Sequence, residues 1–273
     1  MRGIGFGEDS TPIRSSVWTI RLALFSLALL LLTIIFHRIF GMSTLVALNL
    51  FTLAFVGCGL VCLVGLFALV RIWQRGWRGA SNAVTGMVLA LLMLAWPVGA
   101  ILSVPDLPAI NDVTTDVANP PVFRFMAEKR PRGANPIDYP REFAELQSPA
   151  YKDLRAIAIN RPPQEAMDLT RQALQRMRIV IGGETPVGEL GPGWGQIEGV
   201  DRTLVLGFYD DVVVRVQEVR GGSKIDIRSA SRFGRHDFGA NAARIRAIQT
   251  EIIARVEATV PASQRRSRRG QTN

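Results

Sequence analysis

Three long apolar segments near the N-terminus constrain this chain more than any other feature. They cover about residues 17–40, 42–70 and 83–104, and each reaches the ~20 residues that span a bilayer's hydrocarbon core. The first is longer than the apolar region of a usual signal peptide, and no small-residue cleavage pattern follows it. The sequence therefore predicts a membrane domain over residues 1–104 with three retained helices.

Charged residues flank these segments unevenly. Arginines cluster before and at the start of the first segment and between the second and third, whereas aspartates follow the third: Arg2, Arg14, Arg21, Arg71, Arg75 and Arg78 against Asp106, Asp112 and Asp116. Short cytoplasmic flanks carry the excess of basic residues in membrane proteins. We therefore expect an inner-membrane protein with a cytoplasmic N-terminus. Everything after about residue 104 then lies outside, which is the periplasm of a Gram-negative cell.

The net charge of +9 invites comparison with nucleic-acid binders, but its distribution removes most of the support for that class. Residues 1–104 hold seven arginines against two carboxylates, and the tail over 262–273 adds four arginines. Those two segments account for the whole excess, so residues 105–261 are neutral overall. We expect no nucleic-acid partner.

The remainder divides by composition into three parts. Residues 105–150 are polar and proline-rich, which predicts an irregular linker or wrapping arm that docks on the domain. Its basic patch, Arg124, Lys129, Arg130 and Arg132, is either a solvated cluster or a contact for anionic lipid headgroups. Residues 151–261 have globular patterning, and the basic tail over 262–273 has the composition of a disordered segment.

Periodicity within 151–261 predicts an α+β domain in the order β-α-β-β-β-β-α, an antiparallel sheet with two helices on one face. The expected strands lie at 154–159, 179–181, 196–208, 212–217 and 225–228, and the helices at 165–178 and about 237–256. Turns are expected at Gly182-Gly183, 186–195, Asp210-Asp211 and 221–223.

The densest polar run joins the last strand to the last helix and has the pattern S-x-S-R-x-G-R-x-D-x-G-x-N-A-x-R-I from Ser229. Together with residues 206–216 and the Asn111–Pro121 part of the arm, this run resembles the DUF1499 family of unknown function, over roughly residues 110–255. The resemblance implies no known activity. Similar members often carry N-terminal membrane spans, in agreement with the topology expected above.

Two interpretations of this run remain open. Its arginines, hydroxyls and helix N-terminus could bind an anion, and the candidate ligand-binding residues are Ser229, Ser231, Arg232, Arg235, Asp237, Asn241 and Arg244. Alternatively, Asp237 caps the helix and the arginines pair with Asp210, Asp211 or Asp226, in which case the run is structural.

Catalytic and metal sites find little support. His236 is the only histidine after the membrane segments, and both cysteines, Cys58 and Cys62, lie in the second apolar segment. A hydrolase would need His236 with Ser229 or Ser231 and a remote carboxylate. Trp194, in a glycine-rich stretch without a phosphate-loop pattern, is expected in the core or at its rim. We expect no cofactor and no metal.

The sequence thus favours a membrane-anchored binding or scaffolding domain. Besides the lipid bilayer, its expected partner is an anionic lipid, a glycan or another envelope protein. The alternatives are a membrane-anchored hydrolase that uses His236, and a structural subunit of a membrane complex.

Overall fold

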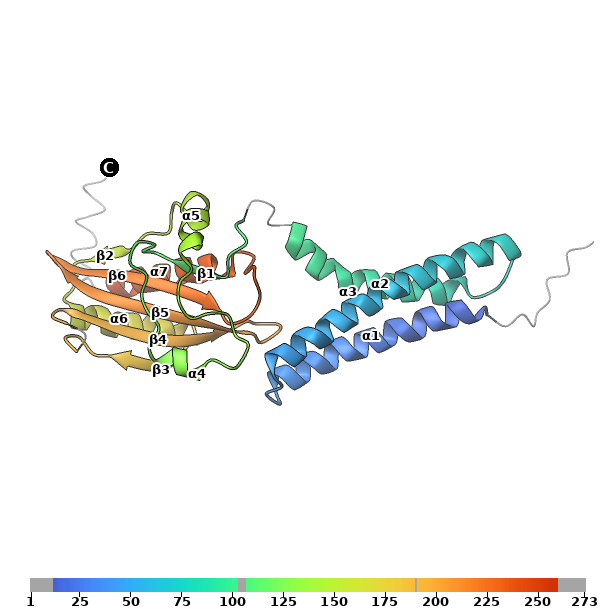
Figure 1. Ribbon diagram of the computed structural model, residues 1–273, viewed down its shortest axis with the longest axis horizontal. Helices are drawn as coiled ribbons and strands as arrows, with labels where there is room; N and C mark the ends of the chain where they lie inside the picture. Colours follow the sequence, from blue (N-terminus) through green and yellow to red (C-terminus); the bar gives the residue numbers. More distant parts are fainter. Residues whose placement is uncertain (1–11, 103–106, 190, 260–273) are drawn as a thin grey trace, which may run out of the picture. The chain divides into compact units, whose positions relative to one another are not determined.

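The computed structural model describes residues 12–102, 107–189 and 191–259, and the chain divides into two compact units (Figure 1). The first unit comprises residues 1–105 and 205–207, and the second comprises 106–204 and 208–273.

The first unit contains three helices that are long and apolar enough to cross a membrane, as predicted. They are α1 (Arg14–Arg38), α2 (Thr44–Arg75) and α3 (Ala80–Leu102). The last two residues of the third expected span, 103 and 104, lie outside the described residues. Each helix packs against the other two.

Small residues allow these helices to approach closely. A Cβ atom added to Gly86 of α3 would lie 3.0 Å from the backbone carbonyl oxygen of Thr19 in α1. Close contacts at small residues are typical of membrane helices, because tight packing rather than the hydrophobic effect drives their association. Cys58 is buried in this interface and Cys62 is half-buried, and both thiols are unpaired.

The second unit contains an antiparallel sheet of six strands with the order β1-β6-β5-β4-β3, and β2 also pairs with β6. The α+β prediction is confirmed. The strands are β1 (Asp112–Thr114), β2 (Ile157–Ile159), β3 (Val180–Thr185), β4 (Trp194–Arg202), β5 (Tyr209–Val219) and β6 (Gly222–Ser231). The helices are α4 (Phe125–Lys129), α5 (Arg141–Ala150), α6 (Pro163–Arg176) and α7 (Ala240–Ala258).

One face of the sheet packs against α6 and α7 and forms the main hydrophobic core (Figure 1). Alternate residues of the strands point into it, as a half-buried strand requires. Fully buried members are Ile197, Val212, Val214, Val216, Ile225, Ile227, Ala173, Leu174, Ile245 and Ile248.

The arm, residues 107–150, packs on the opposite face and contains short regular elements within the segment expected to be irregular. It supplies β1 to the sheet edge, and it contains α4 and α5. Phe123 and Met126 of the arm pack with Val213 and Ala230 of the sheet in a second, smaller core. Both faces of the sheet are therefore partly buried, and the polar side chains of the second face lie under the arm.

Two predicted turns are wrong. Gly182 and Gly183 lie inside β3, beside a bulge, where a side chain at either position would collide with Met126 or Phe125 of α4. Asp210 and Asp211 lie inside β5 and are buried. The glycines make room for the arm, and the aspartates have arginine partners, so neither pair signals a turn here.

The predicted strand over 196–208 is also too long, because β4 ends at Arg202 and a turn follows. The basic tail over 262–273 falls outside the described residues.

Candidate functional site

The strand-to-helix junction begins where β6 ends and is held by the carboxylate of Asp237. One oxygen accepts a hydrogen bond from the Gly239 N–H (2.9 Å) and the other from the Asn241 N–H (2.8 Å). These amides belong to the orphan donors at a helix start. Asp237 is 8% exposed, so its role is to fix the entry into α7.

The hydroxyls and amide of the junction bond to one another. Ser229 donates to the Asn241 side-chain oxygen (2.7 Å), and Asn241 donates to Ser231 Oγ (3.0 Å). Arg244 donates from Nη1 to Ser229 Oγ (3.0 Å) and from Nη2 to Asp210 (2.6 Å). These four candidate residues therefore form an internal network between β6 and α7.

Two carboxylates surround Arg244. Its Nε donates to Asp201 (2.6 Å). Burial alone lowers the pKa of Arg244, but the negative charges of Asp210 and Asp201 raise it overall. Burial raises the pKa of Asp210, and the charge of Arg244 opposes that rise. The guanidinium is thus a structural ion-pair partner.

Arg232 points to the opposite face of the sheet, where Asp211 lies. Its Nη2 and Nε donate to Asp211 at 2.7 and 3.0 Å, and Arg130 of the arm donates to the same carboxylate (2.7 Å). Asp211 is fully buried. The buried carboxylate fixes the arm to the sheet through two arginines from distant parts of the chain.

Arg235 and His236 lie on the exposed part of the junction. Within the described residues, the Arg235 guanidinium makes no hydrogen bond or ion pair. The His236 Nδ1 accepts from the Phe238 N–H (2.8 Å), and the two rings stack with centroids 4.6 Å apart. Because Ser229 and Ser231 bond to Asn241 and His236 bonds to Phe238, these groups do not form the hydrogen-bond relay of a hydrolytic triad.

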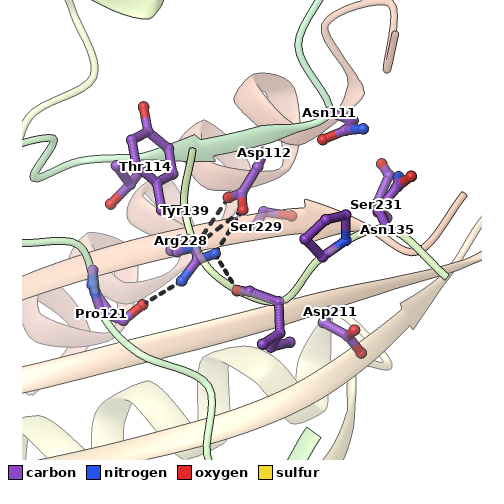
Figure 2. A network of polar contacts seen from close by, with 12 residues as sticks. Asn111, Asp112, Thr114, Pro121, Asn135, Tyr139, Asp211, Arg228, Ser229 and Ser231 are labelled. Carbon is purple, nitrogen blue, oxygen red and sulfur yellow. Dashed lines mark hydrogen bonds and ion pairs between the residues drawn. The ribbon is translucent and has the colours of Figure 1, made fainter. Parts of the chain in front are cut away.

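Figure 2 shows the network under the arm, centred on Arg228 of β6. Arg228 is 2% exposed and makes three hydrogen bonds of 2.7–3.2 Å to Asp112 of β1. It also donates to the carbonyl oxygens of Pro121 (3.0 Å) and Ile137 (2.6 Å). Its guanidinium carbon lies 4.8 Å from the Phe123 ring centroid and 5.6 Å from that of Tyr139. One side chain thus ties three segments of the arm to the sheet.

Neither Asp112 nor Arg228 was predicted from sequence as a site residue, and Asp112 was named only among the charges that follow the third apolar segment. The alternation of Ile225 and Ile227 places Arg228 on the second face of the sheet. This placement is the only local sequence signal for the role of Arg228. Its partner lies far along the chain, on a strand of three residues.

A cavity of about 280 Å³ opens on the second sheet face beside the arm, and we refer to it as the Arg215 pocket. Trp194 and Gln196 of β4 and Arg215 and Gln217 of β5 line it from the sheet. The lining residues from the arm are Asn119, Pro120, Val122 and Arg124. Among these described lining residues there is no Asp or Glu.

Arg215 is 6% exposed and lies next to two carboxylates. Its Nη2 donates to Asp226 (3.0 Å) and contacts Asp116 (3.3 Å), and Lys224 pairs with both carboxylates. Within the described part of the chain, the buried Nε of Arg215 has no hydrogen-bond partner. Arg215 and Lys224 balance Asp116 and Asp226, and the buried Glu198 lies behind the lining, where it accepts from Gln196 Nε2 and the Arg124 N–H. The exposed Arg124 is thus the lining arginine whose guanidinium makes no ion pair among the described residues.

A larger cavity of about 480 Å³ lies within the arm, between its residues 117–122 and its residues 138–144. Arg228 reaches it, but that guanidinium is already bonded to Asp112 and two carbonyls. Asp138 and Arg141 both line this cavity, so opposite charges meet there. Of the two cavities, only the Arg215 pocket has a basic lining without an acidic side chain.

Metal binding finds no support in the described ranges, where no group of three or more His, Cys, Asp and Glu side chains has the arrangement of a metal site.

Comparison with known protein families matches residues 112–252 to the family described as protein of unknown function (DUF1499). The matched region begins at β1 and ends in α7, and it therefore includes the arm as well as the sheet. A search of curated proteins found no match.

Proposed function

Because this chain belongs to the DUF1499 family, for which no activity is described, we propose its function from the geometry. It is an inner-membrane protein whose domain faces the periplasm and binds an anionic component of the cell envelope. The single observation that carries this proposal is the Arg215 pocket, a concave site with two arginines and no acidic lining residue among those described.

The orientation is supported at the junction of α2 and α3. The guanidinium carbons of Arg71 and Arg75 lie 5.3 and 5.1 Å from the Trp77 ring centroid. Tryptophan and arginine together are typical of a membrane–water interface, and arginine marks the cytoplasmic side. A domain that follows α3 would then emerge on the opposite side.

A pair of C-terminal fusions tests this orientation in a Gram-negative host. Alkaline phosphatase is active only outside the cytoplasm, whereas green fluorescent protein exported in unfolded form does not fluoresce. We expect phosphatase activity without fluorescence, and the reverse result would contradict the periplasmic assignment.

The residues proposed from sequence for anion binding now divide into two groups. Ser229, Ser231, Arg232, Asp237, Asn241 and Arg244 are occupied by internal partners, whereas Arg235 is exposed. A ligand at the buried group would have to displace ion pairs such as Arg232–Asp211 and leave a buried carboxylate unpaired, which costs several kcal/mol. Arg235 can still contribute a peripheral contact to an anionic surface.

Arg124 does not carry that cost. Its backbone N–H donates to Glu198 (2.8 Å), but its exposed side chain makes no ion pair within the described residues. A ligand anion can therefore take the Arg124 guanidinium as a partner without breaking the fold.

Binding is tested with the full-length protein in nanodiscs of zwitterionic lipid, titrated by calorimetry with inorganic phosphate and with glucuronate as probe anions. We expect at least one anion to bind, with an affinity that falls at high salt and falls about tenfold or more in Arg124→Gln. The matched control is Arg132→Gln, which removes an exposed arginine of the same arm that does not line the pocket. Absence of binding for both anions, or equal losses in the two variants, would refute the proposed function.

A further inference from the structure

We propose that the ligand of the Arg215 pocket is an acidic saccharide, bound through one sugar ring that carries a carboxylate. This inference rests on the proposed function, because it specifies the anion that the same pocket binds. It follows from the uncharged lining residues, which a simple anion would leave without partners.

Gln196 has a fixed amide orientation. Its Nε2 donates to the Val122 carbonyl oxygen (2.8 Å) and to Glu198 Oε1 (2.8 Å), so both of its N–H groups have acceptors. The side-chain carbonyl oxygen is then left as an acceptor at the pocket, with no hydrogen-bond donor among the described residues. A ligand that satisfies this oxygen must donate a hydrogen bond.

This requirement separates two kinds of anion. A phosphate monoester dianion offers only acceptors, whereas a sugar hydroxyl both donates and accepts. Gln217, which is half-buried at the other end of the pocket, offers a second amide with both donors and an acceptor. The pocket therefore combines arginine for a carboxylate with amides for hydroxyls.

Trp194 adds a large apolar ring to the same pocket. The face of an aromatic ring carries negative charge density and attracts polarised C–H groups, which a pyranose ring presents on its faces. Trp194 is half-exposed and is the only tryptophan after the membrane helices. An aromatic ring beside amides and an arginine is a suitable set of contacts for an acidic sugar.

The size of the pocket fits a single ring. A volume of about 280 Å³ lies at the lower limit of small-molecule sites. The pocket is partly open to solvent, so a longer glycan can enter through one residue while its other residues remain outside.

The inference is tested with the full-length protein in zwitterionic nanodiscs, in a variant whose four tryptophans other than Trp194, at positions 18, 73, 77 and 96, are replaced by phenylalanine. Trp194 then reports directly on the pocket by fluorescence. The probes are glucuronate, glucose and methyl phosphate, at a pH where the phosphate is a dianion without a hydroxyl donor. We expect glucuronate to change the emission of Trp194 and to bind about tenfold more tightly than either of the others, which equals about 1.4 kcal/mol.

Calorimetry with substituted proteins separates the contributions of Trp194 and Gln217 to glucuronate binding. Trp194→Leu should weaken glucuronate about tenfold and leave methyl phosphate unchanged, and Gln217→Ala should weaken glucuronate in the same direction. Phe238→Leu, which alters an exposed aromatic residue outside the pocket, is the matched control. Gln217→Ala also keeps the test decisive if Trp194→Leu does not fold.

The outcomes distinguish this inference from the proposed function. Equal affinities for methyl phosphate and glucuronate, both dependent on Arg124, would overturn the acidic-sugar inference and leave the anion-binding function in place. Glucuronate binding that is unaffected in both the Trp194 and Gln217 variants would likewise overturn the acidic-sugar inference alone. Absence of binding by all three probes would overturn both.

Discussion

Substitution of Arg228 by methionine should destabilise the domain strongly, because it leaves the carboxylate of Asp112 buried without its ion-pair partner. Both residues are 2% exposed, and three hydrogen bonds join their side chains. The substitution also removes the donors to the carbonyl oxygens of Pro121 and Ile137. Loss of one partner from a buried pair costs about 3–5 kcal/mol. That is a large share of the ~5–15 kcal/mol that stabilises a domain.

The free energy of unfolding can be measured by urea titration of the nanodisc-embedded protein, with Trp194 as the only tryptophan. Arg228→Met should lower it by about 3–5 kcal/mol. The matched control Arg141→Met removes an exposed arginine of the arm and should change it by about 0.5 kcal/mol or less.

A double-substituted protein identifies the cause of this loss. If the uncompensated charge of Asp112 is the main cost, then adding Asp112→Leu to Arg228→Met should recover stability. The free energy of unfolding of the double variant should be about 2 kcal/mol higher than the value obtained by adding the losses of the two single variants. A loss below about 1 kcal/mol in Arg228→Met, or strict additivity in the double variant, would refute the reasoning.

Two further predictions concern pH and helix packing. Burial alone raises the pKa of Asp116, but hydrogen bonds and the charges of Lys224 and Arg215 lower it overall. The ionised Asp116 carboxylate therefore stabilises the folded state at pH values above its ordinary pKa of about 3.9. This stabilisation should be lost as pH falls through the lower pKa of the folded state. The unfolding free energies of the natural protein and Asp116→Asn should therefore converge in acid. A constant difference between them from pH 7 to pH 3 would contradict this prediction. Gly86→Leu should separate α3 from Thr19 of α1 and lower the thermal stability of the membrane unit. The control Gly99→Leu should not lower it, because a Cβ added at Gly99 meets nothing within 4 Å. Equal melting temperatures for the two variants would argue against close packing at Gly86.

The parts of the fold that sequence predicted well are those with local signals. The three apolar helices need only length and composition, and α6 and the β5–β6 hairpin need only periodicity and a glycine turn. Asp210 and Asp211 illustrate the limit of such signals. Adjacent aspartates usually mark turns, but here each points to a different face of β5 and pairs with an arginine that is distant in sequence.

In the candidate site, too, only the features with local sequence signals could be predicted. The polar run from Ser229 to Arg244 was recognisable from its pattern, and the pairing of Arg232 with Asp211 and Arg244 with Asp210 was among the alternatives. The Arg215 pocket was not predicted, because it needs the arm to lie beside β4 and β5. The alternation of Val214 and Val216 placed Arg215 on the second face of the sheet, but nothing local indicated that Arg124 would line the same cavity.

The pairing of the arm with the last strand has a consequence for biogenesis. β1 cannot join the sheet until β6 is present, because Asp112 pairs with Ala230. The β5–β6 hairpin closes a short loop, whereas β1 and β2 must close long ones, which is slower and entropically more costly. The segment that leaves the membrane helices first is therefore completed last. During synthesis it stays open to proteases and chaperones until the C-terminal half of the domain has folded.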